Sequence, residues 1–174
     1  MNNNVKLVSK FCSVDETRYH LKFCYHYEPL EALVATDGHK AIIDKSNYHK
    51  DAKAFRGDIY LKHNEFYYDE TVKCPNIVNT IPDRSKVRRL VTDLELGDWV
   101  GKKLSKKPIQ VYFDRFGQFY LSKPRRPAIC LDLRLLSPLA GQTVSIDYKD
   151  NVSPLLITVK DNKDIEILIM PMRL

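Results

Sequence analysis

Apolar residues near the start of the chain recur at helical spacing. Val5, Val8 and Cys12 follow one another at intervals of three and four positions, with lysines on the opposite face. We expect a short helix here, capped by the asparagines that precede it. The aromatic-rich stretch 18–27 is typical of a strand.

An aspartate–glycine pair at 37–38 separates two apolar runs, 30–36 and 39–45. Both residue types tolerate the positive φ of a tight turn, so the pattern predicts a β-hairpin. A second hairpin is predicted over 58–68, turning at 63–64, because another aromatic-rich stretch lies there.

Thr92 and Glu95 have the spacing of a helix capping box, and an apolar face follows them. The pattern predicts a helix over about 93–105 that ends at Pro108. The remaining predicted elements are a hairpin of 109–113 and 118–122, a strand over 128–131, a short helix over 133–140, and strands over 143–149, 155–160 and 165–170.

Helices and antiparallel strands follow one another without the alternation of a parallel β-α-β fold, which indicates the α+β class. The charge balance changes sign near 83–86, after a segment rich in proline and asparagine. We therefore expect two domains, over residues 1–84 and 85–174.

The 174 residues, of which 44% are hydrophobic, argue against disorder. The net charge is +6, and between 84 and 126 twelve lysines and arginines stand against four acidic residues. Such a concentration favours a polyanion such as nucleic acid, the alternative being a solvated surface without a partner. The basic side chains that could meet phosphates there are Lys102, Lys103, Lys106, Lys107, Arg125 and Arg126.

No motif points to an enzyme. The chain has no GxSxG, P-loop or GxGxxG motif, and its five histidines lack metal-ligand spacing. We expect no catalytic residue, no metal and no cofactor, although a carboxylate pair assembled by the fold stays open as an enzymatic alternative. The four cysteines are too far apart for a CxxC pair and are expected to be buried free thiols.

No apolar run approaches the ~20 residues of a membrane span, and the first residues lack the apolar core of a signal peptide. We expect a soluble, cytoplasmic protein that does not associate with membranes. The C-terminal residues ILIMPMRL are apolar almost to the end. Either this strand end packs on the core, or it forms a pocket rim for an apolar peptide.

Several segments resemble the bacterial DNA polymerase III β subunit, the sliding clamp. The stretch 33–40 (LVATDGHK), preceded by 18–21 (RYHL), is similar to part of that family's second domain. The end of the chain, 170–174 (MPMRL), is similar to the C-terminus of enterobacterial members. Residues 128–140, with the strands after them, resemble the close of the third domain, and 74–82 resembles a proline-containing family segment.

The resemblance implies a sliding-clamp fold with a hydrophobic pocket between the second and third domains. In the family this pocket accepts short clamp-binding peptides of DNA polymerases and clamp loaders. Carried over residue by residue, its wall is Leu21, Thr36, Gly38, His39, Lys40, Pro75, Leu168, Met170, Pro171, Met172, Arg173 and Leu174.

Family clamps have three domains per chain and close a dimeric ring around DNA, with basic helices facing the duplex. This chain has room for two shortened domains, so a trimer would supply six domains and a dimer four. Lys6 and Lys10 of the first helix fit the DNA-facing role, together with the lysines at 102–107.

The resemblance thus implies a replication processivity factor, encoded by a phage or mobile element, that binds double-stranded DNA without sequence specificity. Its further partners would be peptides of a polymerase or clamp loader and other copies of the chain. The alternative is a clamp mimic that forms no ring, binds clamp-binding peptides and modulates or inhibits host replication.

Overall fold

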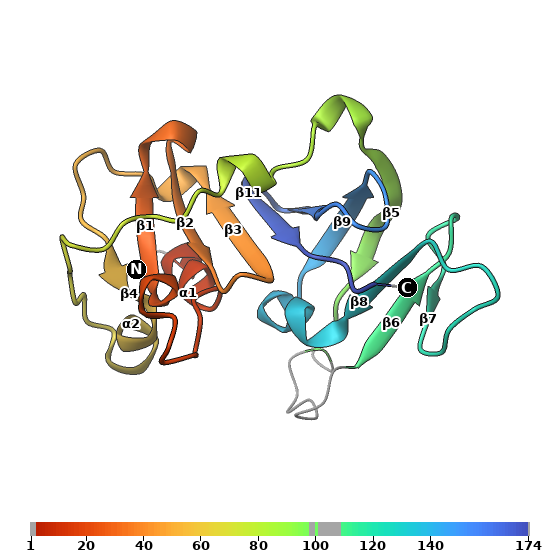
Figure 1. Ribbon diagram of the computed structural model, residues 1–174, viewed down its shortest axis with the longest axis horizontal. Helices are drawn as coiled ribbons and strands as arrows, with labels where there is room; N and C mark the ends of the chain where they lie inside the picture. Colours follow the sequence, from red (N-terminus) through yellow and green to blue (C-terminus); the bar gives the residue numbers. More distant parts are fainter. Residues whose placement is uncertain (1–2, 98–99, 101–108, 174) are drawn as a thin grey trace. The chain divides into compact units, whose positions relative to one another are not determined.

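The computed structural model describes residues 3–97, 100 and 109–173, and it divides into two compact units (Figure 1). Unit 1 comprises Met1–Thr80 and Asp164–Ile167, and unit 2 comprises Ile81–Lys163 and Leu168–Leu174. The first change of unit lies close to the boundary predicted near 83–86. The second falls inside β11 (Asn162–Ile169), which the sequence did not indicate.

Unit 1 contains an antiparallel arrangement of four strands in the order β4-β1-β2-β3. Its helices α1 and α2 lie beside each other against these strands (Figure 1). The strands are β1 (Phe23–Tyr27), β2 (Ala32–Thr36), β3 (Lys40–Asp44) and β4 (Phe55–Arg56). The helices are α1 (Asn3–Ser9) and α2 (Gly57–His63), with 3-10 turns η1 (Tyr19–Lys22), η2 (Glu28–Leu30), η3 (Lys45–Asn47) and η4 (Val78–Thr80).

The predicted hairpin at 37–38 is confirmed, because β2 and β3 pair on either side of it from Thr36 and Ala41 onward. Only Gly38 takes a positive φ, at +92°, so the turn differs from the expected form in which both central residues do. The strand predicted over 18–27 begins later than expected, since residues Tyr19–Lys22 form the 3-10 turn η1.

The hairpin predicted over 58–68 is wrong, because this segment begins with the helix α2. Asn64 does adopt a left-handed conformation, with φ +58°, but it ends the helix by donating its backbone N–H to the Tyr60 carbonyl at 2.9 Å. A Cβ on Gly57 would lie 2.5 Å from the Cys12 sulfur, so the absence of a side chain lets α2 start close to α1. Tertiary packing therefore overrides the β propensity of the aromatic residues.

Two thiols lie side by side in the core of unit 1. The sulfurs of Cys12 and Cys24 are 3.6 Å apart, and the Ser9 hydroxyl lies 3.6 Å from the Cys24 sulfur. The contact with Cys24 and burial raise the pKa of Cys12 well above its usual value. Both cysteines are free and buried, as the sequence predicted.

Unit 2 contains two groups of antiparallel strands. In the first, β9 (Thr143–Tyr148) lies between β10 (Leu155–Val159) and β5 (Arg88–Glu95). In the second, β6 (Gln110–Phe113) lies between β7 (Phe119–Tyr120) and β8 (Ile129–Asp132). The 3-10 segments η5 (Arg84–Lys86) and η7 (Leu133–Leu139) and both ends of β11 also belong to this unit.

The capping-box prediction is wrong, because Thr92 and Glu95 belong to strand β5. This strand pairs Arg88 with Tyr148 and Glu95 with Thr143, and its register shifts twice in between. Asp93 lies in the irregular part with φ +52°. The rest of the predicted helix, apart from Leu96, Gly97 and Val100, lies outside the described residues.

The other predicted strands of the second half are confirmed by β6 to β11 within one to three residues at their ends. The predicted helix over 133–140 is also present, in the tighter 3-10 form. Asp132 caps it as expected, accepting a hydrogen bond from the Arg134 backbone N–H at 3.0 Å. Helices and antiparallel strands together give the α+β class expected from the pattern.

His26 on β1 is held in a neutral form by its surroundings. Its Nδ1 accepts a hydrogen bond from the His49 backbone N–H at 3.2 Å, and its ring lies 6.5 Å from that of Phe55. Burial, together with the nearby His49 side chain, lowers the pKa of His26 from 6.5 to about 4.

We expect the free energy of unfolding to fall as pH decreases from about 6.5 to about 4, because the unfolded chain then binds a proton that folded His26 rejects. The partly exposed site should limit the loss to roughly 1–2 kcal/mol. Urea unfolding across this range measures it. The variant His26→Gln should have a flatter profile between pH 7 and pH 5, and an unchanged slope would contradict this assignment.

Candidate functional site

The turn between β2 and β3 carries four of the residues predicted to bind a peptide. The Asp37 carboxylate accepts hydrogen bonds from the backbone N–H groups of His39 at 2.8 Å and Lys40 at 2.9 Å. The Thr36 hydroxyl accepts from the Gly38 N–H at 3.0 Å and donates to the Lys40 carbonyl at 2.8 Å. These bonds fix the turn and leave His39 exposed at its tip.

The chain around η1 covers one side of this turn. The Arg18 guanidinium donates to the Asp37 carbonyl oxygen at 3.3 Å. A Cβ on Gly38 would lie 3.0 Å from Arg18 Nη1 and 3.7 Å from Leu21 Cδ1, so both side chains pack close to the turn, and the φ of +92° favours glycine there. Leu21, another predicted peptide-binding residue, is thus brought next to the turn, but its side chain is buried.

A pocket of about 310 Å³ opens beside the same turn. Lys10, residues 12–15 and Arg18 line one side, and Asp37, His39 and Lys40 line the other. Most of its lining residues are polar or charged types, which differs from the hydrophobic pocket implied by the resemblance.

Lys40 is the most enclosed charge at this turn. Its ammonium lies 3.7 Å from the Asp37 carboxylate and 5.3 Å from the centre of the Phe11 ring. Burial lowers the pKa of Lys40, while Asp37 opposes that shift. Lys40 therefore has a structural partner within the turn.

Pro75 belongs to an irregular segment of unit 1 that ends in η4. Its neighbour Cys74 is half-buried, and burial raises the pKa of that thiol to about 12. Pro75 is itself half-buried, so part of this residue is accessible to solvent.

The C-terminal segment follows β11 and is attached to strand β8. The Met172 backbone N–H donates to the Cys130 carbonyl at 2.8 Å. Met170 is 39% exposed and Arg173 is exposed, whereas Leu168 is buried at 3% and serves the core. Pro171 is half-buried, and the predicted Leu174 lies outside the described residues.

Met172 also lines an open pocket of about 700 Å³ within unit 2. Its other lining residues are Ile109, two residues of β6, among them Tyr112, and the chain after β7, beginning with Leu121. Leu121 is 69% exposed. This surface combines adaptable and flat apolar side chains, which suits an apolar peptide side chain.

The predicted DNA-binding residues fall at separate places in the sequence. Lys6 and Lys10 are exposed and four positions apart at α1, and Arg125 and Arg126 are exposed on the loop between β7 and β8. The lysines at 102, 103, 106 and 107 lie outside the described residues. The pair on α1 and the pair on the loop are therefore both accessible to solvent.

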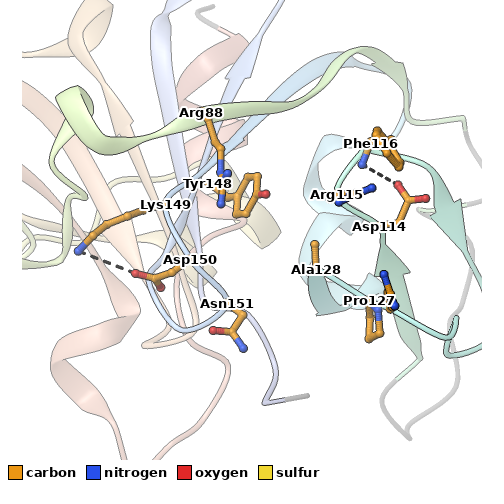
Figure 2. Close-up of a pocket in the computed structure, with 11 residues that line it drawn as sticks. Arg88, Asp114, Arg115, Phe116, Pro127, Ala128, Tyr148, Lys149, Asp150 and Asn151 are labelled. Atoms are coloured by element: carbon orange, nitrogen blue, oxygen red, sulfur yellow. Dashed lines mark hydrogen bonds and ion pairs between the residues drawn. The ribbon is translucent and has the colours of Figure 1, made fainter.

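Sequence reasoning missed a pocket of about 560 Å³ in unit 2 (Figure 2). Arg88, Arg115, Arg126 and Lys149 line it together with Phe116 and Tyr148. Of these residues only Arg126 was singled out from the sequence. The available signal was the turn Arg115-Phe116-Gly117, which places a cation beside an aromatic residue.

Two further expectations concern chemistry and membranes. Across residues 3–97, 100 and 109–173, no group of three or more His, Cys, Asp or Glu side chains is arranged to hold a metal ion. In the same part of the chain, no helix combines the length and the apolar character that crossing a membrane requires.

Comparison with known structures identifies the fold. The chain superimposes on the DNA polymerase III β subunit of Borrelia burgdorferi, in complex with a natural product, with a TM-score of 0.65 and 17% identity over 98% of this chain. The chain has the sliding-clamp fold. It is also similar to the griselimycin-bound clamp of Bartonella birtlesii, at TM-score 0.64, 16% identity and 98% coverage, and to the β subunit of Streptococcus pyogenes, at 0.63, 13% and 99%.

The chain spans about three-fifths of the length of these clamps: 61%, 63% and 64% respectively. No protein-family model matches the sequence. No curated protein matches it either. The sliding-clamp fold expected from the residues at 33–40 and 170–174 is thus confirmed through structure, at an identity too low to carry function by itself.

Proposed function

We propose that this chain is a sliding-clamp-like replication factor without enzymatic activity, which holds DNA by its backbone and docks clamp-binding peptides of a polymerase or clamp loader. The observation that carries the proposal is the sliding-clamp fold over 98% of the chain. The exposed basic residues and the partly exposed apolar C-terminal segment add independent support from chemistry.

The C-terminal segment is our proposed anchor for the peptide. Met170 and Met172 have flexible, polarisable side chains that can adapt to leucine and phenylalanine of a Q-L-x-L-F-type peptide. The backbone bond from Met172 to Cys130 holds the segment at β8, so its side chains are oriented before a peptide arrives. His39 and Lys40 of unit 1 are the second proposed group of contacts.

We expect a Q-L-x-L-F-type peptide to bind at micromolar Kd, and deletion of residues 172–174 to abolish that binding. The deletion also removes the backbone bond to Cys130, so Met172→Ala serves as the sharper variant, because it keeps the bond and shortens only the side chain. Isothermal titration calorimetry should show roughly tenfold weaker binding for Met172→Ala, equal to about 1.4 kcal/mol.

The matched control for this experiment is Val152→Ala, since Val152 is an exposed apolar residue of unit 2 away from the C-terminal segment. It should bind the peptide like the unmodified chain. Absence of any peptide binding to the unmodified chain would overturn the proposed site.

DNA binding is proposed to rest on contacts between lysines and phosphates. Replacing Lys102, Lys103, Lys106 and Lys107 by alanine should weaken duplex binding and lower the slope of log affinity against log salt by about 3–4, since each phosphate contact contributes roughly 0.9. Fluorescence anisotropy at several salt concentrations measures both effects.

The control variant carries the same change in charge at exposed lysines elsewhere, namely Lys50, Lys62, Lys73 and Lys163. It should keep most of the salt slope. Equal slopes for the two variants would mean that the lysines at 102–107 are a solvated surface without a role in binding.

A ring is proposed to form from several copies of the chain, and three copies of a two-unit chain would supply six units. Unit 1 exposes a group of large side chains that suits an interface: Leu61, Phe66, Tyr67 and Tyr68 are 37%, 47%, 52% and 51% exposed. Such a group is unusual on a surface without a partner.

Light scattering should report a mass of about three times 20.3 kDa, and the protein should be retained on circular DNA but not on the same DNA after linearisation. Tyr67→Lys should shift the mass towards the monomer. A monomer at high micromolar concentration would exclude a stable ring and favour the alternative, a clamp mimic that competes for clamp-binding peptides.

A further inference from the structure

The pocket of about 560 Å³ in unit 2 lies outside the predicted peptide site. Figure 2 shows Arg88, Tyr148 and residues 149–151 on one side of it, and residues 114–116 with Pro127 and Ala128 on the other. Four separate segments therefore contribute, namely β5, the turn after β9, the turn between β6 and β7, and the loop before β8.

Lys149 pairs with Asp150 at 3.8 Å in this pocket. Its three arginines, Arg88, Arg115 and Arg126, have no ion pair with any residue that the structure describes. The two carboxylates of the pocket are engaged in their own turns. Asp114 accepts from the backbone N–H groups at 116 and 118, at 2.8 and 3.0 Å, and Asp150 accepts from those at 152 and 153, at 3.0 and 2.6 Å.

Two aromatic rings accompany these guanidinium groups. Phe116 is 77% exposed, and the Arg115 guanidinium lies 4.6 Å from its ring centre. On the opposite side the Arg88 guanidinium lies 4.8 Å from the ring centre of Tyr148. A solvent-exposed phenylalanine among cations is a suitable platform for a flat, apolar ring that carries negative charge beside it.

The platform is fixed against the opposite side of the pocket. A Cβ on Gly117 would lie 2.0 Å from the Leu90 carbonyl oxygen, so this turn packs directly on β5 and only glycine fits there. Gly117 also has φ +79° and donates its N–H to the Asp114 carbonyl at 3.0 Å. Leu90 is two residues from Arg88 on the same strand. The contact therefore holds Phe116 and Arg88 at a fixed separation before a ligand binds.

We propose that this pocket binds a nucleotide segment of single-stranded DNA, with a base stacked on Phe116 and the flanking phosphates held by Arg88 and Arg126. Bases in a duplex are already stacked and paired, so an exposed ring of this kind favours a single strand. The site goes beyond the proposed clamp function, which requires only duplex backbone contacts and a peptide. It would let the protein hold the unpaired strand beside a primed duplex.

The test uses the full chain, a dye-labelled twelve-residue oligo(dT) and a hairpin duplex of equal charge. Phe116→Ala should weaken oligo(dT) binding roughly tenfold, within the range expected for loss of one base stack, and leave duplex affinity unchanged. Val152→Ala is the matched control, because Val152 is also an exposed apolar residue of unit 2 and does not line this pocket. It should leave both affinities unchanged.

Charge is tested by two neighbouring variants. Arg126→Ala should weaken oligo(dT) binding more than Arg125→Ala does, since only Arg126 lines the pocket, although both remove one positive charge. Equal losses would mean that long-range attraction alone acts here, which would overturn the site.

Two competitors separate the ligand sources. An excess of free thymidine monophosphate should displace oligo(dT) only weakly. Any displacement of oligo(dT) by an excess of a poly-glutamate peptide should be the same for the unmodified chain and for Phe116→Ala. Strong competition by the mononucleotide would replace the strand by a free nucleotide as ligand, and an oligo(dT) affinity unaffected by Phe116→Ala would overturn the proposal. Peptide binding and retention on circular DNA are measured separately, so they can fail or succeed independently of this result.

Discussion

The pairing of β5 with β9 is the interaction on which the second unit depends. It pairs Arg88 with Tyr148 and Glu95 with Thr143. A strand from the start of the unit is thereby joined to the strands β9 and β10 from near its end. The turn after β6 then packs on β5 through Gly117, which has no side chain to prevent it. The basic pocket exists only because these long-range contacts bring four segments together.

The first helix, the hairpin at Asp37-Gly38 and the strands from 109 onward could be predicted from the sequence, because each depends on local periodicity or turn chemistry. The segments at 58–64 and 92–95 could not, because tertiary contacts decide their conformation. Asn64 has the turn geometry expected of it but closes a helix, and Thr92 and Glu95 have capping spacing but pair within a sheet. Local patterns describe what a segment can do, and its partners determine which form is the more stable.

The candidate sites also differ in how much of them the sequence could predict. The sequence pointed to the turn at 36–40 and to the C-terminal segment, since both are contiguous in the chain and similar to clamp segments. It could not predict that Leu21 and Leu168 are buried or that Asp37 neutralises Lys40. Nor could it predict the pocket around Phe116, whose charges come from residues as far apart as Arg88 and Lys149.

The adjacent thiols of Cys12 and Cys24 have a consequence for following the protein's stability. Both thiols are buried away from a reagent, and the raised pKa of Cys12 further disfavours its reactive thiolate while the surrounding structure is closed. Alkylation of this pair therefore requires an opening of the core between α1 and β1. The rate of labelling of these two cysteines, read by mass spectrometry, would report how often unit 1 opens, with no foreign probe added to the chain.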